Sequence, residues 1–325
     1  MYPFQFSTAA DESAALDAGE AGARYIAGGT TLVDLMRQTV ERPEALVDIN
    51  SLPYRDIDLN ATRLRVGSLA RMSELAAHPG VRQQFPVISE ALELSASAQL
   101  RNMASIGGNL MQRPRCLYFR DVSGACNRRN PGSGCAAIDG RNRTLAIFGT
   151  SDQCVATHPS DLAVALTMLD ATVIVRDRDG DHPIRIAEFF RQPGDTPSEE
   201  HNLRSGQLIV AVEVPVRPDT RRSGYLKVRD RQSYEFALCS AAIALDIAGG
   251  TVRSARVAVG GVGTVPWRLP AVESAIAGRP PSAELWRSAS ALAGDGAKPL
   301  SENGFKVELV KRTVERQLTT VAALR

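Results

Sequence analysis

The sequence IAGGTTL at residues 26–32 decides the fold expected for the first third of the chain, because it joins a short apolar strand to an amphipathic helix. Gly28 and Gly29 permit positive φ and close approach of a ligand to the backbone. Thr31 is a candidate N-cap, with Asp34 three residues further on. The free N–H groups and positive dipole end of such a helix suit a pyrophosphate. Taken alone, the stretch is more typical of an ordinary strand–turn–helix connection.

The segments around this stretch alternate between strand-like and helix-like patterns. Residues 46–49 and 64–67 alternate as half-buried strands, and residues 71–77 and 87–100 have helical periodicity. This rhythm predicts a small α/β unit with a mostly parallel sheet. The chain contains neither G-x-G-x-x-G after the first strand nor G-x-x-x-x-G-K-[ST], so conventional Rossmann and P-loop folds are not supported.

A second glycine pair occurs in SIGGNL at residues 105–110, flanked by short hydrogen-bonding side chains. Two such loops in one α/β region would clamp a dinucleotide from both sides; two ordinary glycine turns are an equally weighted alternative. Further on, Ser160 and Asp161 begin an apolar helix at 162–169. Capping alone accounts for both residues, and the functional alternative is a hydrogen bond to cofactor ribose or phosphate.

The chain after Pro218 changes character. Before Pro218, a hairpin is expected at 171–186. After it, three strands are expected at 225–228, 236–247 and 253–260, followed by three helical stretches near 270–277, 282–292 and 303–324. Strands followed by helices predict a separate α+β domain with helices on one face of an antiparallel sheet. We place the boundary near residue 220.

Composition excludes several classes of protein. A chain of 325 residues suggests about two domains. Its 38 Lys and Arg residues against 36 Asp and Glu residues give a net charge of +2, which does not favour a nucleic-acid or anionic-membrane partner. No apolar run is long enough to span a membrane. Without a basic leader at the N-terminus, the chain by itself is expected in the cytoplasm.

Four of the five cysteines, Cys116, Cys126, Cys135 and Cys154, lie close together in the sequence, in a long irregular region. A chain this large does not need disulfides, so the group indicates a metal or cluster site more than a disulfide framework. The spacing matches neither the C-x₂₋₄-C pairs of structural zinc sites nor compact ferredoxin motifs. A four-thiolate iron–sulfur site and unrelated free thiols both remain open; Cys239, in an apolar run, is expected in the core.

Seven arginines lie in or beside the same region. In an iron–sulfur site they would offset the negative charge of the thiolates and donate hydrogen bonds to sulfur; in the alternative they belong to a solvated loop. They are Arg113, Arg115, Arg120, Arg128, Arg129, Arg141 and Arg143. No acid–base pair, G-x-S-x-G motif or metal-type histidine pair is recognisable, and we predict no catalytic residue.

Together these motifs resemble the FAD-binding subunit of molybdenum hydroxylases, the xanthine dehydrogenase family. The resemblance rests on AGGT at 27–30, SIGGNL at 105–110, SDL at 160–162 and GGV at 260–262 with PWR at 266–268. It implies an α+β chain: a two-part FAD-binding domain of the vanillyl-alcohol-oxidase type at 1–219 and a C-terminal α+β domain at 220–325.

The cysteine region narrows the resemblance. Residues 99–102 (QLRN), 131–137 (PGSGCAA) and 154–161 (CVATHPSD) resemble the FAD subunit of bacterial three-subunit aldehyde oxidoreductases. This resemblance implies that a loop at about 112–156 binds a [4Fe–4S] cluster beside FAD. The implied cluster ligands are Cys116, Cys126, Cys135 and Cys154.

The resemblance also carries over FAD-binding positions. The pyrophosphate is placed on Ala27, Gly28, Gly29, Thr30, Thr31 and Leu32. The flavin side is placed on Ser105, Gly108 and Asn109. Asp161 matches a contact to the ribose or adenosine part, and Ile209 a backbone contact near the cofactor. Lys227 matches a lysine beside the isoalloxazine, where its charge would stabilise reduced, anionic flavin.

The function implied is electron relay. In the family, a large molybdenum-cofactor subunit oxidises an aldehyde, a small subunit with [2Fe–2S] clusters passes on the electrons, and FAD delivers them to an external acceptor. One alternative is the FAD subunit of an aromatic acyl-CoA reductase or another hydroxylase of the family. Another is a zinc-binding scaffold without redox function. A partner subunit's leader would carry the chain to the periplasm by co-export.

Overall fold

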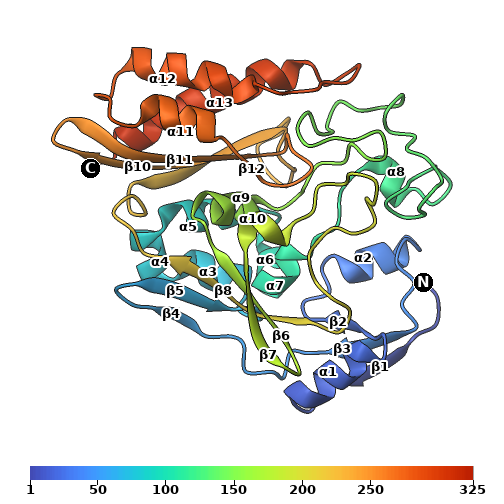
Figure 1. Cartoon of the computed structure of the whole chain (residues 1–325). Coiled ribbons are helices and arrows are strands. Elements are labelled where there is room, and N and C mark those ends of the chain that lie inside the picture. The colour runs from blue at the N-terminus through green and yellow to red at the C-terminus, as the bar shows by residue number, and fades with distance from the viewer. Residues whose placement is uncertain (325) are drawn as a thin grey trace.

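Three β-sheets organise the computed structural model, which describes residues 1–324 (Figure 1). The first sheet contains β1 (Gln5–Thr8), β3 (Ala45–Asp48) and β2 (Arg24–Ile26) in that order, with both pairings parallel. The crossovers contain α1 (Glu12–Glu20) and α2 (Leu32–Arg37). The parallel α/β unit predicted from the sequence is therefore present, with three strands.

The second sheet corrects the prediction for residues 64–67, which were expected to extend the parallel unit. It has five strands in the order β4 (Ile57–Leu59), β5 (Arg63–Gly67), β8 (Leu208–Pro215), β6 (Thr172–Asp177) and β7 (Gly180–Arg185), all antiparallel. A turn of three residues joins β4 to β5, too short for the crossover that parallel strands need. The β6–β7 hairpin is as predicted.

Five short helices follow β5 in the chain and precede the cysteine region. They are α3 (Met72–Ala77), α4 (Pro79–Gln84), α5 (Pro86–Glu93), α6 (Ala98–Met103) and α7 (Ile106–Leu110). The single helix expected at 87–100 is broken, because Ala96 adopts a φ of 47° and Ser97 starts a new helix by accepting from Leu100 N. A left-handed residue cannot continue an α-helix.

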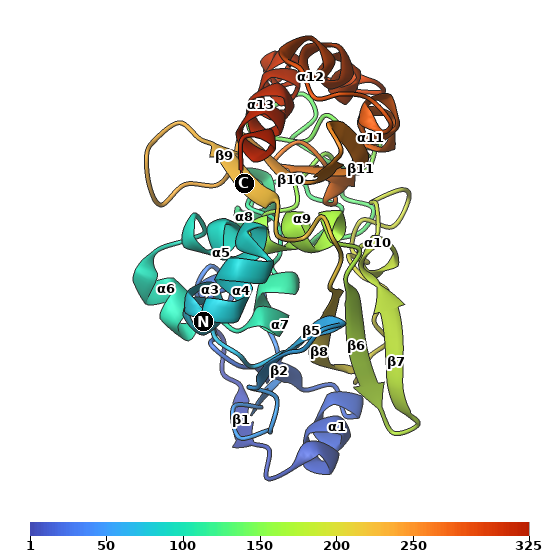
Figure 2. The same ribbon diagram turned by 90° about the vertical axis from the view of Figure 1, so that its left-hand side faces the viewer.

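The third sheet is antiparallel with helices on one face, as predicted, and its first strand begins at Ser223. Its strands are β12 (Trp267–Arg268), β11 (Thr251–Gly260), β10 (Cys239–Ala248) and β9 (Ser223–Val228), all antiparallel. One face is covered by α11 (Pro270–Ile276), α12 (Ala283–Ser290), the 3₁₀ turn η1 (Ala291–Gly294) and α13 (Phe305–Ala322). The other face packs on α9 (Asp161–Met168) (Figure 2). This fully buried helix, capped by Ser160 as expected, joins the two halves of the molecule.

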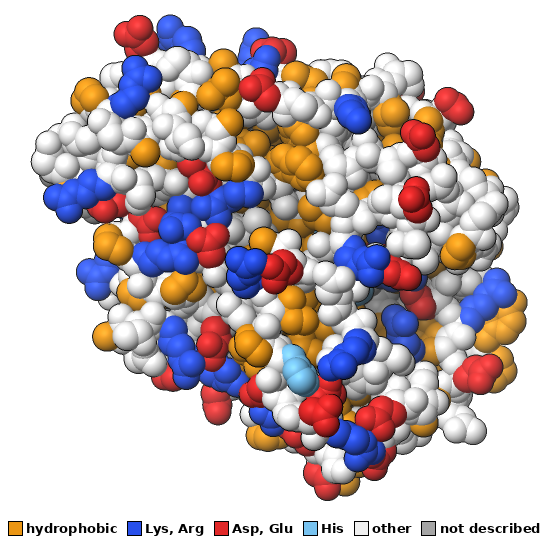
Figure 3. Space-filling model, viewed as in Figure 1, with side chains coloured by type: hydrophobic (Ala, Val, Ile, Leu, Met, Phe, Trp, Pro, Cys, Tyr) orange, Lys and Arg blue, Asp and Glu red, His pale blue; other side chains and the backbone are white. Residues whose placement is uncertain are grey.

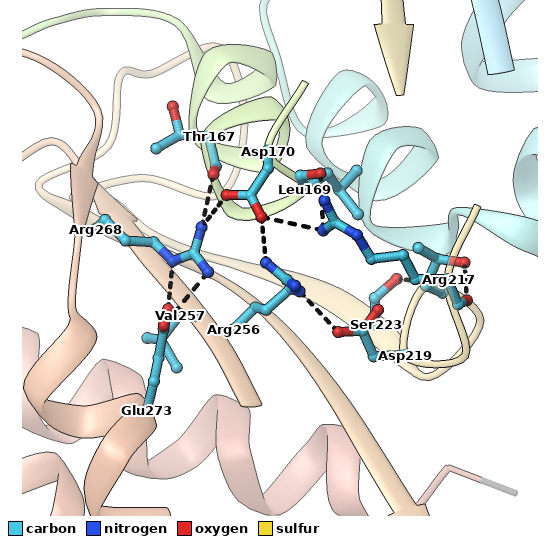
Figure 4. A network of polar contacts seen from close by, with 11 residues as sticks. Thr167, Leu169, Asp170, Arg217, Asp219, Ser223, Arg256, Val257, Arg268 and Glu273 are labelled. Carbon is cyan, nitrogen blue, oxygen red and sulfur yellow. Dashed lines mark hydrogen bonds and ion pairs between the residues drawn. The ribbon is translucent and has the colours of Figure 1, made fainter. Parts of the chain in front are cut away.

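A network of charged side chains reinforces that junction (Figure 4). Asp170, just after α9, pairs with Arg268 at 2.7 Å, with Arg217 at 3.1 Å and with Arg256. Arg256 also reaches Asp219 at 2.9 Å. Burial by itself would raise the pKa of Asp170, but the arginines hold it below its usual value. The carboxylate is therefore ionised and links the two halves across their contact.

The region at 112–156 has one short helix, α8 (Leu117–Arg120), and packs against the C-terminal half. Ile147 N donates to Val262 O at 2.8 Å, and Phe148 stacks on Trp267. Lys306 of α13 is fully buried, and its Nζ donates to three carbonyls, those of Thr144, Leu145 and Gly261, at 2.7–3.0 Å. The C-terminal half therefore holds this region in place.

The surface agrees with the near-neutral charge of the sequence. On the face shown in Figure 3, acidic and basic side chains are intermingled and do not gather in one basic patch. Within residues 1–324, every helix is too short or too polar to cross a lipid bilayer.

Candidate functional site: a glycine-lined cleft beside a cysteine cavity

A cleft of about 860 Å³ opens between the β2–α2 turn, α7 and the start of β8. This volume lies in the range typical of cofactor sites. Both glycine motifs, which are far apart in the sequence, contribute to its lining. The predicted FAD-binding residues that line it are Ala27, Gly28, Gly29, Thr30, Thr31, Leu32, Ser105, Gly108 and Ile209.

The two glycines of the first motif are each required for a different structural reason. Gly29 adopts a φ of 68°, a left-handed conformation that side chains rarely adopt. A Cβ on Gly28 would lie 2.0 Å from the carbonyl oxygen of Met103, at the end of α6. Gly29 therefore shapes the turn, and Gly28 allows that turn to pack against α6.

Thr31 is the N-cap residue of α2, as predicted, but its side chain makes no capping hydrogen bond. Asp34 does not complete a capping box either; its carboxylate pairs with Arg115 and Arg120 from the cysteine region. Thr31 instead belongs to the lining of the cleft.

The second motif forms α7, where Ser105 Oγ accepts from Gly108 N at 3.2 Å. Asn109, on the same helix, is buried and lies outside the lining. Its Oδ1 accepts from Ser160 Oγ at 2.5 Å, which ties α7 to the start of α9. The predicted flavin contacts at Ser105 and Gly108 are thus in the cleft, whereas Asn109 supports it from behind.

Asp161 and Lys227 also lie outside the lining and pair with each other. Lys227 Nζ is 2.8 Å from Asp161 Oδ2, and their side chains are only 1% and 7% exposed. The carboxylate also accepts from Tyr225 Oη at 2.7 Å and from Ser95 Oγ at 3.0 Å. Burial raises the pKa of Tyr225, so its hydroxyl remains a donor. The structure places these two residues at the junction of α9 and β9.

Sequence reasoning missed the far wall of the cleft, which is the segment between α10 (Ile186–Phe189) and β8. It contributes Arg191, Glu200, His201 and Gly206, among others. Burial lowers the pKa of His201 to about 4, so the ring is neutral near pH 7. Tyr25 of β2 donates to Gly206 O at 2.6 Å and fixes the segment. Its composition is that of any loop, and only its position before Ile209 could have signalled a role.

The four clustered cysteines line a second, much smaller cavity, together with Phe119 and Arg128. All four are free thiols; three are buried and Cys135 is partly exposed. Burial raises the pKa of Cys116 to about 11, and the nearby Cys126 and Cys154 add to this. Within residues 1–324, no three His, Cys, Asp or Glu side chains converge closely enough to hold a metal ion. The cavity therefore does not have the geometry of a preformed single-ion site.

The arginines around this cavity are not a uniformly solvated group. Arg128 is 5% exposed, its Nη2 donates to Cys154 Sγ at 3.5 Å, and its buried Nε has no partner. Arg115 and Arg120 each also have one buried nitrogen without a partner. Arg129 donates to backbone carbonyls of α8. Arg141 and Arg143, by contrast, are exposed. An unpartnered, buried N–H beside thiols is suited to an anionic group in the cavity.

Comparisons with known proteins define the class. The family described as "FAD binding domain in molybdopterin dehydrogenase" matches residues 2–217, and "CO dehydrogenase flavoprotein C-terminal domain" matches residues 224–321. The chain belongs to this family of FAD-binding molybdenum hydroxylase subunits.

Among its relatives, the aldehyde oxidoreductase FAD-binding subunit PaoB of Escherichia coli (strain K12) is 45% identical over 307 residues, covering 93% of this chain and 92% of PaoB. The glyceraldehyde dehydrogenase medium chain of Sulfolobus acidocaldarius is 26% identical over 333 residues, covering 99% and 100%.

A solved structure shows the same fold. Quinoline 2-oxidoreductase from Pseudomonas putida 86 matches with a TM-score of 0.77 at 20% identity, covering 99% of this chain and 97% of that one. The predicted family and two-part fold are confirmed. PaoB and the Sulfolobus protein are both named as parts of aldehyde-oxidising enzymes, which favours the aldehyde oxidoreductase prediction over the acyl-CoA reductase and zinc-scaffold alternatives.

Proposed function

We propose that this chain is the FAD-binding, electron-transferring subunit of a molybdenum-dependent aldehyde oxidoreductase. The observation that carries the proposal is that two separate glycine motifs line one cleft of cofactor size, in a chain that belongs to this flavoprotein family. Bound there, FAD would take up electrons from partner redox centres and deliver them to an external acceptor. The protein's part is to bind and orient the cofactor.

The contacts to FAD are proposed from the lining. The backbone at 27–32 would receive the pyrophosphate, since this turn lines the cleft and Gly29 holds it in a left-handed conformation. Ser105, Gly108 and Ile209 would border the flavin side. We keep Asn109, Asp161 and Lys227 as supporting residues: Asn109 ties α7 to the start of α9, and the Asp161–Lys227 pair fixes α9 on β9.

The domain division and the partners are also proposals. The matched ranges 2–217 and 224–321 support domains at 1–219 and 220–325. By analogy with relatives named as FAD-binding subunits and medium chains, the partners are a large molybdenum-cofactor subunit and a small [2Fe–2S] subunit. The molybdenum and [2Fe–2S] centres would belong to those subunits.

We further propose a [4Fe–4S] cluster held by Cys116, Cys126, Cys135 and Cys154. The residues fit such a group, because all four cysteines line one cavity and Arg128 already donates to Cys154 Sγ. The unpartnered Nε of Arg128 provides one more donor for an anionic cluster. Thiolate ligands suit iron–sulfur clusters, and hydrogen bonds to sulfur tune their potential.

The experiment is to purify this chain alone and, separately, with its molybdenum and [2Fe–2S] subunits. FAD, iron and acid-labile sulfide are measured per chain, and both preparations are assayed with benzaldehyde and a dye acceptor. We expect FAD and iron in both, and aldehyde oxidation only in the complex. Turnover by the single chain would contradict the relay function, and a colourless chain would contradict the cofactor assignments.

A further inference from the structure

One carboxylate, that of Glu200, lies in the wall between the cleft and the cysteine cavity. Glu200 belongs to the lining of the cleft, yet its side chain is only 10% exposed. Its Oε1 accepts from Arg113 Nε at 2.7 Å, and its Oε2 is 3.2 Å from Arg128 Nη1. Glu200 therefore contacts an arginine on each side of the wall.

Arg128 continues the contact into the second cavity. Its guanidinium faces Glu200 through Nη1 and Cys154 Sγ through Nη2. A series of side-chain contacts, Cys154–Arg128–Glu200, therefore connects a thiol of the cysteine cavity to the wall of the cleft. Each of these side chains is at most 10% exposed.

Arg113 closes the set on the side of the cleft. It pairs with Glu41 as well as Glu200, and its guanidinium lies over the ring of Phe119, 4.6 Å from the centroid. Two arginines and two glutamates give no net charge. Such buried ion pairs add little stability compared with apolar residues, so stability alone is a weak reason for them. In a poorly solvated wall, however, each charge acts at longer range than in water.

We infer that Arg128 and Glu200 are positioning residues that couple the two sites electrostatically, so that removing the charge of either changes the reduction potential at both. The inference rests on the proposed occupancy of the sites by FAD and a cluster. A group that accepts an electron without a proton becomes more negative. Removing the negative charge of Glu200 therefore favours reduction at both sites, and removing the positive charge of Arg128 opposes it at both.

The test uses Glu200→Gln, which keeps the shape of the side chain, in the assembled complex. Redox titration follows the flavin by visible absorbance and the cluster by electron paramagnetic resonance. We expect both midpoint potentials to shift to more positive values. The matched control is Glu188→Gln, since Glu188 is exposed, pairs with Arg185 and lies outside both cavities. The control should match the wild type.

A second variant, Arg128→Gln, is assessed by its flavin potential, because Arg128 lines the cysteine cavity and the flavin site is the more distant of the two. We expect its cluster potential to shift to a more negative value and its flavin potential to follow in the same direction by less, while Arg128→Lys restores part of both. An unchanged cluster potential in Glu200→Gln overturns the coupling. If Glu200→Gln loses its iron, an unchanged flavin potential in Arg128→Gln overturns it instead. Wild-type protein without iron would contradict the proposed cluster itself, which is a separate outcome.

Discussion

The cleft and the cysteine cavity are neighbours built in opposite ways. The cleft is lined by turns and helix starts of the first 210 residues, and its shape comes from glycines placed next to regular elements. The cysteine cavity is formed by a segment with one short helix and is held from outside by the C-terminal half. A site made by local turns can be recognised from short motifs, whereas a site made by a supported loop depends on contacts distant in sequence.

The largest expected effect comes from Gly29→Val. A β-branched residue at a φ of 68° costs roughly 1–2 kcal/mol. Its Cβ would also lie 3.1 Å from Val33 Cγ2, so the turn on which the pyrophosphate is proposed to lie would have to shift. We expect the purified variant to contain essentially no FAD while it keeps its iron. The two contents are measured on the same sample.

The matched control is Gly180→Val in the β6–β7 hairpin. Gly180 also has a positive φ, 114°, but lies outside both cavities, and a Cβ there meets nothing within 4 Å. It should bind FAD as the wild type does. Stoichiometric FAD in Gly29→Val would remove the first motif from the site.

The converse variant is Cys126→Ser. Serine is a poor ligand for iron, and three thiolates rarely hold a cluster securely. We expect the loss of most iron and acid-labile sulfide with FAD retained. Cys239→Ala is the control, because Cys239 is buried in β10 among apolar residues and should leave both contents unchanged. Unchanged iron in Cys126→Ser would exclude Cys126 as a ligand.

An intermediate effect is expected from Lys306→Met, which tests the external support of the cysteine region. Burial lowers the pKa of Lys306 to about 7, yet its Nζ satisfies three buried carbonyls. Methionine fills the space and leaves those acceptors without donors, at a cost of about 3 kcal/mol in the free energy of unfolding. We expect iron to be lost more readily on gel filtration, with FAD content unchanged.

Lys311→Met on the same helix is the control, since Lys311 is partly exposed and pairs with Glu308. Unfolding midpoints and iron contents of the two variants are compared. Equal iron retention in both would contradict the dependence of the cysteine cavity on α13.

The difference between local turns and a loop held by distant contacts also explains which features could be predicted from the sequence. The glycine turn at 28–29, the Ser160 cap and the β6–β7 hairpin depend on neighbouring residues, and these were predicted correctly. The second glycine pair was expected in a loop and instead lies in the helix α7. β5 pairs antiparallel with two strands: β4, which was not recognised from the sequence, and β8, which lies far along the chain and is not visible in a local pattern. Asp34 was expected to support its own helix, but arginines of the cysteine region pair with it instead.

The far wall of the cleft was invisible for a related reason. Glu200 and His201 lie in a segment whose composition is that of any surface loop. Glu200 is shielded from solvent by its contacts with Arg113 and Arg128, which belong to another part of the chain. The ring of His201 lies against that of Phe189. The Asp161–Lys227 pair likewise joins residues on two different elements, and only the tertiary structure shows that each already has a partner.

The smallest effect is expected at the junction of the two halves, from Asp170→Asn. Asp170 pairs with three arginines but its side chain is 44% exposed, so solvent and salt screen the interaction. Asparagine keeps hydrogen-bonding capacity and loses the charge, and we expect a loss of about 1 kcal/mol in the free energy of unfolding.

That difference should shrink at high salt, whereas Asp295→Asn, an exposed control, should show none. Because the support of the cysteine region runs through Lys306 and the Val262 backbone, iron and FAD contents should both stay at wild-type values. A selective loss of iron would instead show that this charged junction also positions the cysteine cavity, and that the cleft alone is independent of how the two halves meet.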